Sequence, residues 1–163
     1  MKAGWKVKTL GEVTSIINGG TPKSAVSEFW GGEVAWLTPK DMGKLSNHNV
    51  SSTSRTITQL GLSKCSAKLI PENSIILSTR APIGHLAINT VPMAFNQGCR
   101  GLVPNDSLNL KYLFHYLSAN IDVMNDLGTG TTFKELSAGA LKSLQIPLPP
   151  LEEQKRIVSI LDE

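Results

Sequence analysis

Hydrophobic and polar positions follow two different rhythms along this chain. Up to Pro104, short apolar runs alternate with turn signals rich in Gly, Pro and Asn, a pattern typical of strands joined by tight connections. The runs predict short strands at residues 34–37, 74–78, 85–88 and 101–103. This part of the chain is therefore expected to contribute short strands joined by turns and loops.

Helical spacing takes over in the last third. From Asn109 onward, apolar residues recur every three or four positions, which predicts one helix ending near Asp126, before Gly128. Its apolar stripe consists of Leu110, Leu113, Phe114, Leu117, Ile121 and Met124. An earlier short helix is predicted over residues 59–66, capped by Thr58. The apolar side of that helix would consist of Leu60, Leu62 and Cys65.

The final segment predicts a short helix at 136–143, an extended run at 144–148 and a last helix that starts after Pro149-Pro150. The last helix carries an apolar seam, which consists of Ile157, Val158, Ile160 and Leu161. This seam either docks on the domain or packs against a partner helix. The whole pattern predicts a mixed α/β (α+β) globular domain with a short mixed sheet and helices.

Charge is distributed unevenly along the chain. Residues 1–111 contain 12 basic and 6 acidic side chains, whereas residues 112–163 contain 4 basic and 7 acidic ones. The first part could therefore present a positive face to a polyanion such as a nucleic acid. An ordinary scatter of surface charge would give the same counts, so both interpretations stay open.

Composition excludes several classes of protein. With 163 residues, 40% hydrophobic and 18% charged, the chain fits one globular domain. Apolar stretches such as Ile75-Ile76-Leu77 are far shorter than a membrane span, and the first eight residues lack the apolar core of a secretory signal. Cys65 and Cys99 lie outside any CxxC pair, as expected of reduced thiols. We therefore expect a cytoplasmic protein with no membrane partner.

Several segments together resemble one protein family. The chain has the run Ile146-Pro147-Leu148-Pro149-Pro150-Leu151-Glu152-Glu153-Gln154-Lys155-Arg156-Ile157-Val158. This run resembles the junction between a target recognition domain and its helix in the specificity (S) subunits of type I restriction-modification systems. Other segments agree in order: Leu10-Gly11-Glu12-Val13, Gly19-Gly20-Thr21-Pro22, Trp36-Leu37-Thr38-Pro39-Lys40-Asp41-Met42, Ile57-Thr58-Gln59-Leu60-Gly61-Leu62, Ser78-Thr79-Arg80-Ala81-Pro82-Ile83-Gly84, Phe95-Asn96-Gln97-Gly98 and Gly128-Thr129-Gly130-Thr131-Thr132. Their common order covers nearly the whole chain, which makes the resemblance specific.

The resemblance implies a DNA target recognition domain at residues 1–148 and the start of a conserved spacer helix at residues 149–163. It implies half of a specificity subunit, which pairs through that helix with a second recognition domain or a second copy of itself. The implied partners are double-stranded DNA and the methyltransferase (M) and restriction (R) subunits. No cofactor is expected on this chain, because S-adenosylmethionine would bind the partner methyltransferase. The seam residues Ile157, Val158, Ile160 and Leu161 would bind the partner.

No catalytic motif stands out in the sequence. An amino-methyltransferase needs an FxGxG-type cofactor loop and a D/N-P-P-Y/F clamp, whereas Pro149-Pro150 follows Leu148. The E-x-K triplet at Glu153 has no preceding Pro-Asp strand, and a carboxylate in the first turn of a helix is explained by the helix dipole. The three histidines lack neighbours at metal-ligand spacing, so no metal is expected.

Sequence-specific DNA binding needs cations near phosphates and polar side chains at base edges. Arg80 and Gln97 are the strongest candidates, because both lie in motif segments between predicted strands. Two alternatives stay open: the amides of Asn96-Gln97-Gly98 could stabilise a local turn, and Arg80 could pair internally with a carboxylate. The full candidate set is Thr21, Lys23, Lys40, Lys44, Asn47, Arg55, Arg80, Asn96, Gln97, Arg100, Thr131 and Lys134.

The resulting prediction is a non-catalytic domain that reads a short half-site in duplex DNA and directs the modification and restriction subunits to it. The alternative is a protein-interaction module, a solitary half-subunit that dimerises or competes for the methyltransferase. The two hypotheses differ in whether the basic loops or the apolar seam carries the function.

Overall fold

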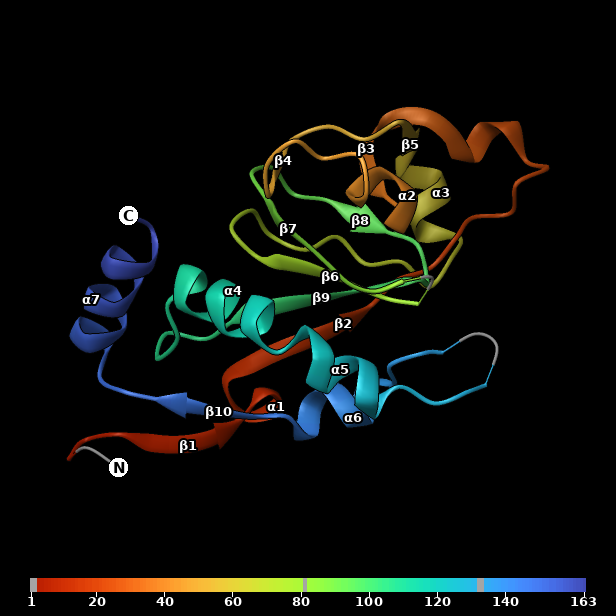
Figure 1. The fold of residues 1–163 in the computed structure, drawn as a ribbon. Coiled ribbons are helices and arrows are strands. Elements are labelled where there is room, and N and C mark those ends of the chain that lie inside the picture. The colour runs from red at the N-terminus through yellow and green to blue at the C-terminus, as the bar shows by residue number, and fades with distance from the viewer. Residues whose placement is uncertain (1–2, 81, 132–133) are drawn as a thin grey trace.

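Three sheets organise the fold in the computed structural model, which describes residues 3–80, 82–131 and 134–163 (Figure 1). The central sheet has the order β2-β9-β6-β7-β4, with β2 (Thr14–Asn18), β9 (Cys99–Pro104), β6 (Ile75–Thr79), β7 (Ile83–Asn89) and β4 (Asn49–Val50). A second sheet has the order β5-β3-β8, with β5 (Arg55–Ile57), β3 (Trp30–Leu37) and β8 (Ala94–Phe95). A separate ribbon pairs β1 (Lys6–Thr9) with β10 (Gln145–Leu148).

The helices are α1 (Leu10–Val13), α2 (Pro39–Met42), α3 (Gln59–Ser63), α4 (Leu110–Ala119), α5 (Ile121–Leu127), α6 (Ala138–Ser143) and α7 (Leu151–Leu161), with a 3₁₀ turn at Ser27–Phe29. The predicted mixed α/β class is confirmed. The four predicted strands also lie where β3, β6, β7 and β9 are observed.

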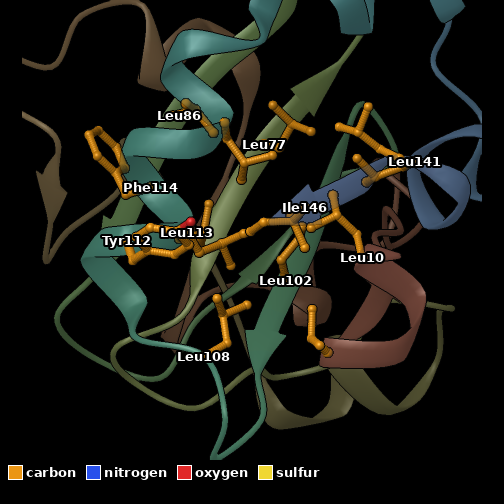
Figure 2. Packing of buried hydrophobic residues seen from close by; sticks show 14 of the residues in the cluster. Leu10, Leu77, Leu86, Leu102, Leu108, Tyr112, Leu113, Phe114, Leu141 and Ile146 are labelled. Atoms are coloured by element: carbon orange, nitrogen blue, oxygen red, sulfur yellow. The ribbon is translucent and has the colours of Figure 1, made fainter. Parts of the chain in front are cut away.

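The central sheet is covered on both faces, which explains the continuous apolar run of β6. All five residues of β6 are buried. Because side chains alternate along a strand, Ile75 and Leu77 face the core under the helices, whereas Ile76 faces the core that contains Phe95 of β8. Figure 2 shows Leu77 packed among side chains from α4, α6, β9 and β10.

The single helix predicted for residues 109–126 is wrong, because α4 and α5 are separate helices that meet at Asn120. The backbone of Asn120 is not helical (φ −117°, ψ 23°). Its side-chain amide donates to the carbonyl oxygen of Tyr116 at 2.7 Å, a local bond that competes with helical pairing. The apolar stripe survives this break, since Leu113 and Met124 are both fully buried.

The short helix α3 agrees with its predicted cap and in part with its predicted apolar side, since Leu62 and Cys65 pack against the core cluster that contains Trp36. The Thr58 hydroxyl accepts a hydrogen bond from the Gly61 amide at 2.9 Å, and the helix ends at Ser63, three residues earlier than predicted. Leu60 is 45% exposed. The close contact is made by Gly61, where a Cβ would lie only 2.4 Å from the carbonyl oxygen of Phe29.

Helix α4 covers the free edge of β10. The Tyr112 hydroxyl donates to the Pro147 carbonyl oxygen at 2.7 Å, and the Tyr116 hydroxyl donates to the Gln145 carbonyl oxygen. The two tyrosines are four positions apart and so lie on one face of the helix. Carbonyl groups that a third strand would otherwise bind are thereby satisfied within the domain.

The root of α7 is fixed to the domain by Gln154, whose side chain is fully buried. Its Oε1 accepts a hydrogen bond from the Asn109 amide at 2.7 Å. Its Nε2 donates to the carbonyl oxygens of Ser107 and Pro149, both at 2.9 Å. The side chain therefore joins the start of α7 to the start of α4.

The rest of α7 divides its apolar seam between two environments. Val158 is 9% exposed and belongs to the main core, against which Ile157 also packs. Ile160 and Leu161 remain 55% and 53% exposed. The assignment of Val158 to partner binding is thus corrected, because this side chain is buried in its own domain.

The last turn of α7 is also tied to α4. The Asp162 carboxylate lies 2.7 Å from Nε2 of His115 and 3.5 Å from Nζ of Lys111. The hydrogen bond from His115 lowers the pKa of Asp162 below its usual value. Residues 154, 158 and 162 therefore form one docked face of α7, since residues four apart share a side of a helix.

Candidate nucleic-acid interface

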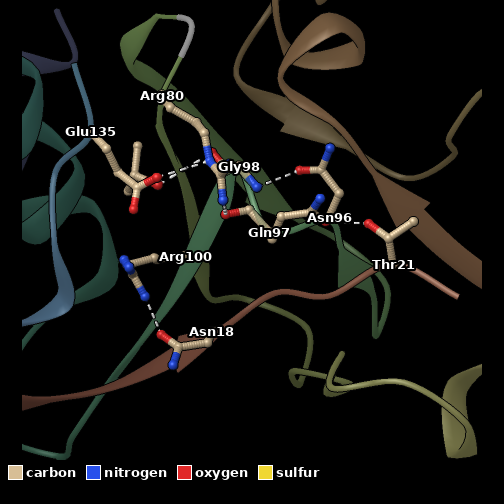
Figure 3. A network of polar contacts seen from close by, with 9 residues as sticks. Asn18, Thr21, Arg80, Asn96, Gln97, Gly98, Arg100 and Glu135 are labelled. Atoms are coloured by element: carbon tan, nitrogen blue, oxygen red, sulfur yellow. Dashed lines mark hydrogen bonds and ion pairs between the residues drawn. The ribbon is translucent and has the colours of Figure 1, made fainter. Parts of the chain in front are cut away.

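Polar side chains gather where three strands of the central sheet reach the same end (Figure 3). β2 ends at Asn18, β6 is followed directly by Arg80, and Arg100 is the second residue of β9. Because β9 is antiparallel to both neighbours, Asn18 and Arg100 pair directly across the sheet. With side chains from adjacent loops, they form what we call the sheet-end cluster: Asn18, Thr21, Arg80, Asn96, Gln97, Gly98, Arg100 and Glu135.

Arg80 is held at two points. Its Nε lies 3.2 Å from Oε1 of Glu135, and its Nη2 donates to the carbonyl oxygen of Gln97 at 3.0 Å. The internal ion pair left open by the sequence is therefore confirmed. Both contacts use the edge formed by Nε and Nη2, and among the described residues none accepts from Nη1. The outer edge of the guanidinium thus keeps donors for a further ligand.

The turn before β9 presents one bound amide and one exposed amide. Asn96 Oδ1 accepts a hydrogen bond from the Gly98 amide at 2.9 Å, which confirms the local-turn alternative for this residue. Gln97 is exposed, and its Oε1 accepts a hydrogen bond from the Thr21 hydroxyl. The amide nitrogen of Gln97 therefore remains as a donor at the surface.

Arg100 is only partly exposed. Its Nη1 donates to Oδ1 of Asn18, and burial lowers the pKa of the guanidinium, which the nearby Glu135 carboxylate opposes. The adjacent Cys99 is fully buried, and burial raises the pKa of its thiol to about 12. Arg100 therefore supplies a positive charge fixed at the rim of the core rather than a freely moving one.

The segment that follows α5 closes onto this end of the sheet. Thr129 and Glu135 exchange two backbone hydrogen bonds, at 3.0 and 2.9 Å. The Leu136 amide donates to the Thr79 carbonyl oxygen at 2.9 Å, next to Arg80. The Glu135 side chain is thus anchored through its own backbone.

Two predicted candidates lie in this segment. Thr131 and Lys134 are exposed, and Nζ of Lys134 lies 3.5 Å from the Asn125 carbonyl oxygen. Thr132 of the same motif and Ala81, which follows Arg80, lie outside the described residues. Lys134 adds a second exposed cation beside the sheet-end cluster.

Helix α2, which follows β3 of the second sheet, borders the sheet-end cluster. A Cβ on Gly98 would lie 3.2 Å from Cγ of Pro39, so the start of α2 lies directly against the turn before β9. Lys40 follows Pro39 and is exposed. Arg80 and Arg100 thus share the sheet-end cluster with exposed Gln97, and Glu135 adds one negative charge. Lys40 and Lys134 are exposed sequence neighbours of Pro39 and Glu135, which border or belong to the cluster.

The chain is similar in sequence and in fold to known proteins. The chain matches the family model described as Type I restriction modification DNA specificity domain over residues 2–163. This chain belongs to that family. The predicted family resemblance is thereby confirmed, and the sheet-end cluster is a feature of a specificity domain.

Similar proteins agree in sequence and in fold. The specificity domain is 35% identical over 159 residues to the specificity subunit of the type I restriction enzyme MjaIX of Methanocaldococcus jannaschii, covering 96% of this chain and 37% of that relative. It matches the HsdS subunit from Thermoanaerobacter tengcongensis with a TM-score of 0.76 and 31% identity, covering 99% and 37% of the two chains. A structure concerned with complex assembly and conformational transition of the type I R-M system gives 0.76 and 32%, covering 99% and 38%. The chain thus spans less than half the length of these relatives.

Two predicted candidates lie apart from the sheet-end cluster of this specificity domain. The Arg55 guanidinium stacks 4.0 Å from the ring centroid of Trp30 and 5.3 Å from that of Trp36. Lys23 is exposed, and its carbonyl oxygen accepts a hydrogen bond from Nε1 of Trp30 at 3.1 Å. No contact among the described residues joins either side chain to the cluster.

Lys44 and Asn47 lie in the loop that leads to β4. Asn47 lines a cleft of about 300 Å³ between this loop, β7 and the α4–α5 junction. Its Oδ1 accepts a hydrogen bond from the Asn49 amide at 2.8 Å, which is a local turn. Lys44 is exposed. The structure therefore does not bring this pair together with Arg80.

Sequence reasoning missed Asn18 and Glu135. Asn18 carried a signal, since Asn18-Gly19-Gly20 reads as a turn after a strand. Glu135 carried none, because it is 55 positions beyond Arg80 and comes next to it only in the folded chain, through backbone contacts of residues 135–136 with Thr129, Thr79 and Arg80.

In the described parts of the specificity domain, no three His, Cys, Asp or Glu side chains come together as ligands for a metal ion. Likewise, no helix in residues 3–80, 82–131 and 134–163 is long and apolar enough to span a membrane.

Proposed function

We propose that this chain reads a short half-site in duplex DNA through the sheet-end cluster. The observation that carries the proposal is the convergence of Arg80, which follows β6, with Gln97, in the turn before β9, and Arg100, near the start of β9. Exposed Lys40 follows Pro39, which lies against this turn, and exposed Lys134 precedes Glu135. Membership of a DNA specificity family supports the same conclusion. Cations and amides on one surface are the groups that phosphates and base edges require.

The residues fall into two chemical roles. The outer edge of Arg80 and the amide of Gln97 match base edges, since Arg pairs with guanine and Gln with adenine in the major groove. Lys40 and Lys134 match phosphates, because an exposed ammonium acts as a mobile point charge. We assign base reading to the first pair and orientation on the backbone to the second.

A second surface would pack against a partner helix and so help to position the modification subunit. Ile160 and Leu161 of α7 are exposed and lie outside the docked face formed by residues 154, 158 and 162. We propose that they pack against a partner helix, from a second recognition domain or a second copy of this chain, and help to position the methyltransferase and restriction subunits. In this proposal the chain has no catalytic activity of its own, and S-adenosylmethionine binds the methyltransferase subunit.

Selection from randomised duplex DNA tests the proposal. The chain is incubated with the library near physiological salt, alone and with the methyltransferase subunit, and bound DNA is sequenced. Enrichment of one short motif in either condition is the expected result. Absence of any motif in both conditions contradicts the proposal and favours an interaction module.

Single substitutions test whether DNA binding depends on the sheet-end cluster. Arg80→Gln should lower affinity for the enriched motif by about 5-fold to 150-fold, the range of a good bidentate base contact. Lys68→Gln removes the same charge at an exposed residue outside the cluster and serves as the matched control. Equal losses in the two variants would show that net charge, not the cluster, determines binding.

The interaction module remains the alternative because of the exposed apolar pair on α7. Leu161→Asp places a charge at a residue that is 53% exposed, so the domain should remain folded. Under the main proposal this variant keeps the selected motif and loses affinity for the methyltransferase subunit. If only Leu161→Asp, and not Arg80→Gln, changes any measured binding, the alternative is correct.

A further inference from the structure

The sheet-end cluster contains one carboxylate among its cations. Oε1 of Glu135 lies 3.2 Å from Nε of Arg80, and its charge also acts on Arg100. Figure 3 shows Glu135 and Arg100 beside each other at this end of the sheet. At a surface proposed to bind a polyanion, a negative charge opposes binding. Its presence therefore points to a role other than raising affinity.

The position of this carboxylate is set by the backbone around it. Glu135 is paired with Thr129 by two backbone hydrogen bonds, and the Leu136 amide is bound to the Thr79 carbonyl oxygen. Arg80 and Glu135 also form a backbone bridge. The backbone of Glu135 is therefore fixed next to Arg80, so its carboxylate reaches the guanidinium without any movement of the main chain.

The ion pair leaves one edge of Arg80 available in a fixed orientation. Glu135 and the Gln97 carbonyl oxygen occupy the edge formed by Nε and Nη2. The remaining edge, with Nη1, can donate two parallel hydrogen bonds to neighbouring acceptors on a base. A phosphate at the same place would carry its negative charge close to the Glu135 carboxylate, whereas a base edge is neutral.

We propose that Glu135 is a specificity-determining residue, which holds Arg80 for a base edge and weakens attraction of the cluster to phosphate. This inference rests on the proposed DNA-reading function. It concerns the ratio of affinity for the selected motif to affinity for unrelated DNA, rather than affinity alone. The side chains of Arg80 and Glu135 are 42% and 45% exposed, so both are accessible to a bound duplex.

The test measures both affinities for wild type and Glu135→Gln across a range of salt concentrations. Removal of one opposing charge should steepen the dependence of log K on log salt by about 0.9, which corresponds to roughly fivefold tighter non-specific binding near 0.15 M salt. Affinity for the selected motif should not rise with it, because Arg80 loses its ionic partner. The specificity ratio should therefore fall about fivefold or more.

Glu72→Gln provides the matched control. Glu72 is exposed and precedes β6, whereas Arg80 follows that strand, so the same charge is removed at the opposite end of the strand. This control should leave the specificity ratio unchanged. A second variant, Glu135→Asp, retains the charge and should keep the wild-type salt dependence.

The outcomes separate this inference from the proposed function. If wild type selects no motif, the proposed function itself fails. If wild type selects a motif and Glu135→Gln leaves the ratio within twofold, the role of Glu135 is refuted while DNA reading stands. An equal fall of the ratio in Glu72→Gln also refutes it, because net charge alone would then explain the effect.

Discussion

Replacing Gln154 by Leu removes the side chain that joins α7 to the domain. The substitution retains a similar volume in a fully buried position, so its effect comes mainly from hydrogen bonding. It leaves the Asn109 amide and the carbonyl oxygens of Ser107 and Pro149 without the partners that they have in the wild type. The free energy of unfolding should therefore fall, because these three hydrogen bonds of Gln154 are lost.

The magnitude follows from the three bonds. Each contributes about 0.5–1.5 kcal/mol, and a buried partner left unsatisfied costs about 1–3 kcal/mol. Ser107 is exposed, so water can replace one of the bonds. We expect a loss of about 2–3 kcal/mol in the free energy of unfolding, or roughly 5–10 °C in Tm for a domain of this size.

Urea unfolding and amide hydrogen exchange measure this effect. Protection of the α7 amides should fall about 30-fold or more for a loss of about 2 kcal/mol. Gln59→Leu, at an exposed glutamine in the first turn of α3, is the matched control and should stay within about 0.5 kcal/mol of wild type. A change below about 0.5 kcal/mol in the free energy of unfolding of Gln154→Leu, with an unchanged m value, would refute the claim that the Gln154 hydrogen bonds hold α7 on the domain.

Three further substitutions or treatments have defined outcomes. Gly19→Ala places a Cβ 1.9 Å from a backbone carbonyl oxygen of the turn before β9, so urea unfolding should show a loss of about 1–3 kcal/mol in the free energy of unfolding. Gly139→Ala is the control: its Cβ has open space around it, so this variant should be as stable as wild type or more stable. Cys99 is fully buried with a pKa of about 12, so a thiol reagent should label the partly exposed Cys65 of the native protein and reach Cys99 only on unfolding. The hydrogen bond from His115 lowers the pKa of Asp162, so its stabilising effect is complete above about pH 5 and is lost as the pH falls through the lowered value. The difference in unfolding free energy between wild type and Asp162→Asn should accordingly shrink on acidification below about pH 5, and a difference that stays constant or grows would contradict this account.

Local signals in the sequence predicted much of the fold. Thr58 caps α3 because a hydroxyl before a helix satisfies a free amide, a relation that needs only neighbouring residues. The apolar stripe that includes Leu113 and Met124 was equally readable, since its period reports the buried side. The break at Asn120 was not, because the amide–carbonyl bond that replaces helical pairing leaves no mark on hydrophobic spacing.

The candidate site was predicted only in part, because its contacts join distant segments. Arg80 and Gln97 could be selected from their residue types and motif positions, and the structure brings them within one hydrogen bond of each other. The ion pair with Glu135 depends on how the segment after α5 returns to β6. Val158 fails as a partner residue for a similar reason, since the seam alone does not say which of its members the domain itself covers.

Because β1 pairs with β10, the first strand of the chain is synthesised long before the strand that it pairs with. β1 is complete at Thr9, but the strand that it pairs with among the described residues begins only at Gln145. At translation rates of about 5–20 residues per second, the first strand waits roughly 7–30 s for its partner. Ile146 and Leu148 of that late strand also enter the main core. β10 leads directly into α7, whose Val158 is also in this core, so completing the core and fixing the direction of α7 belong to the same late step.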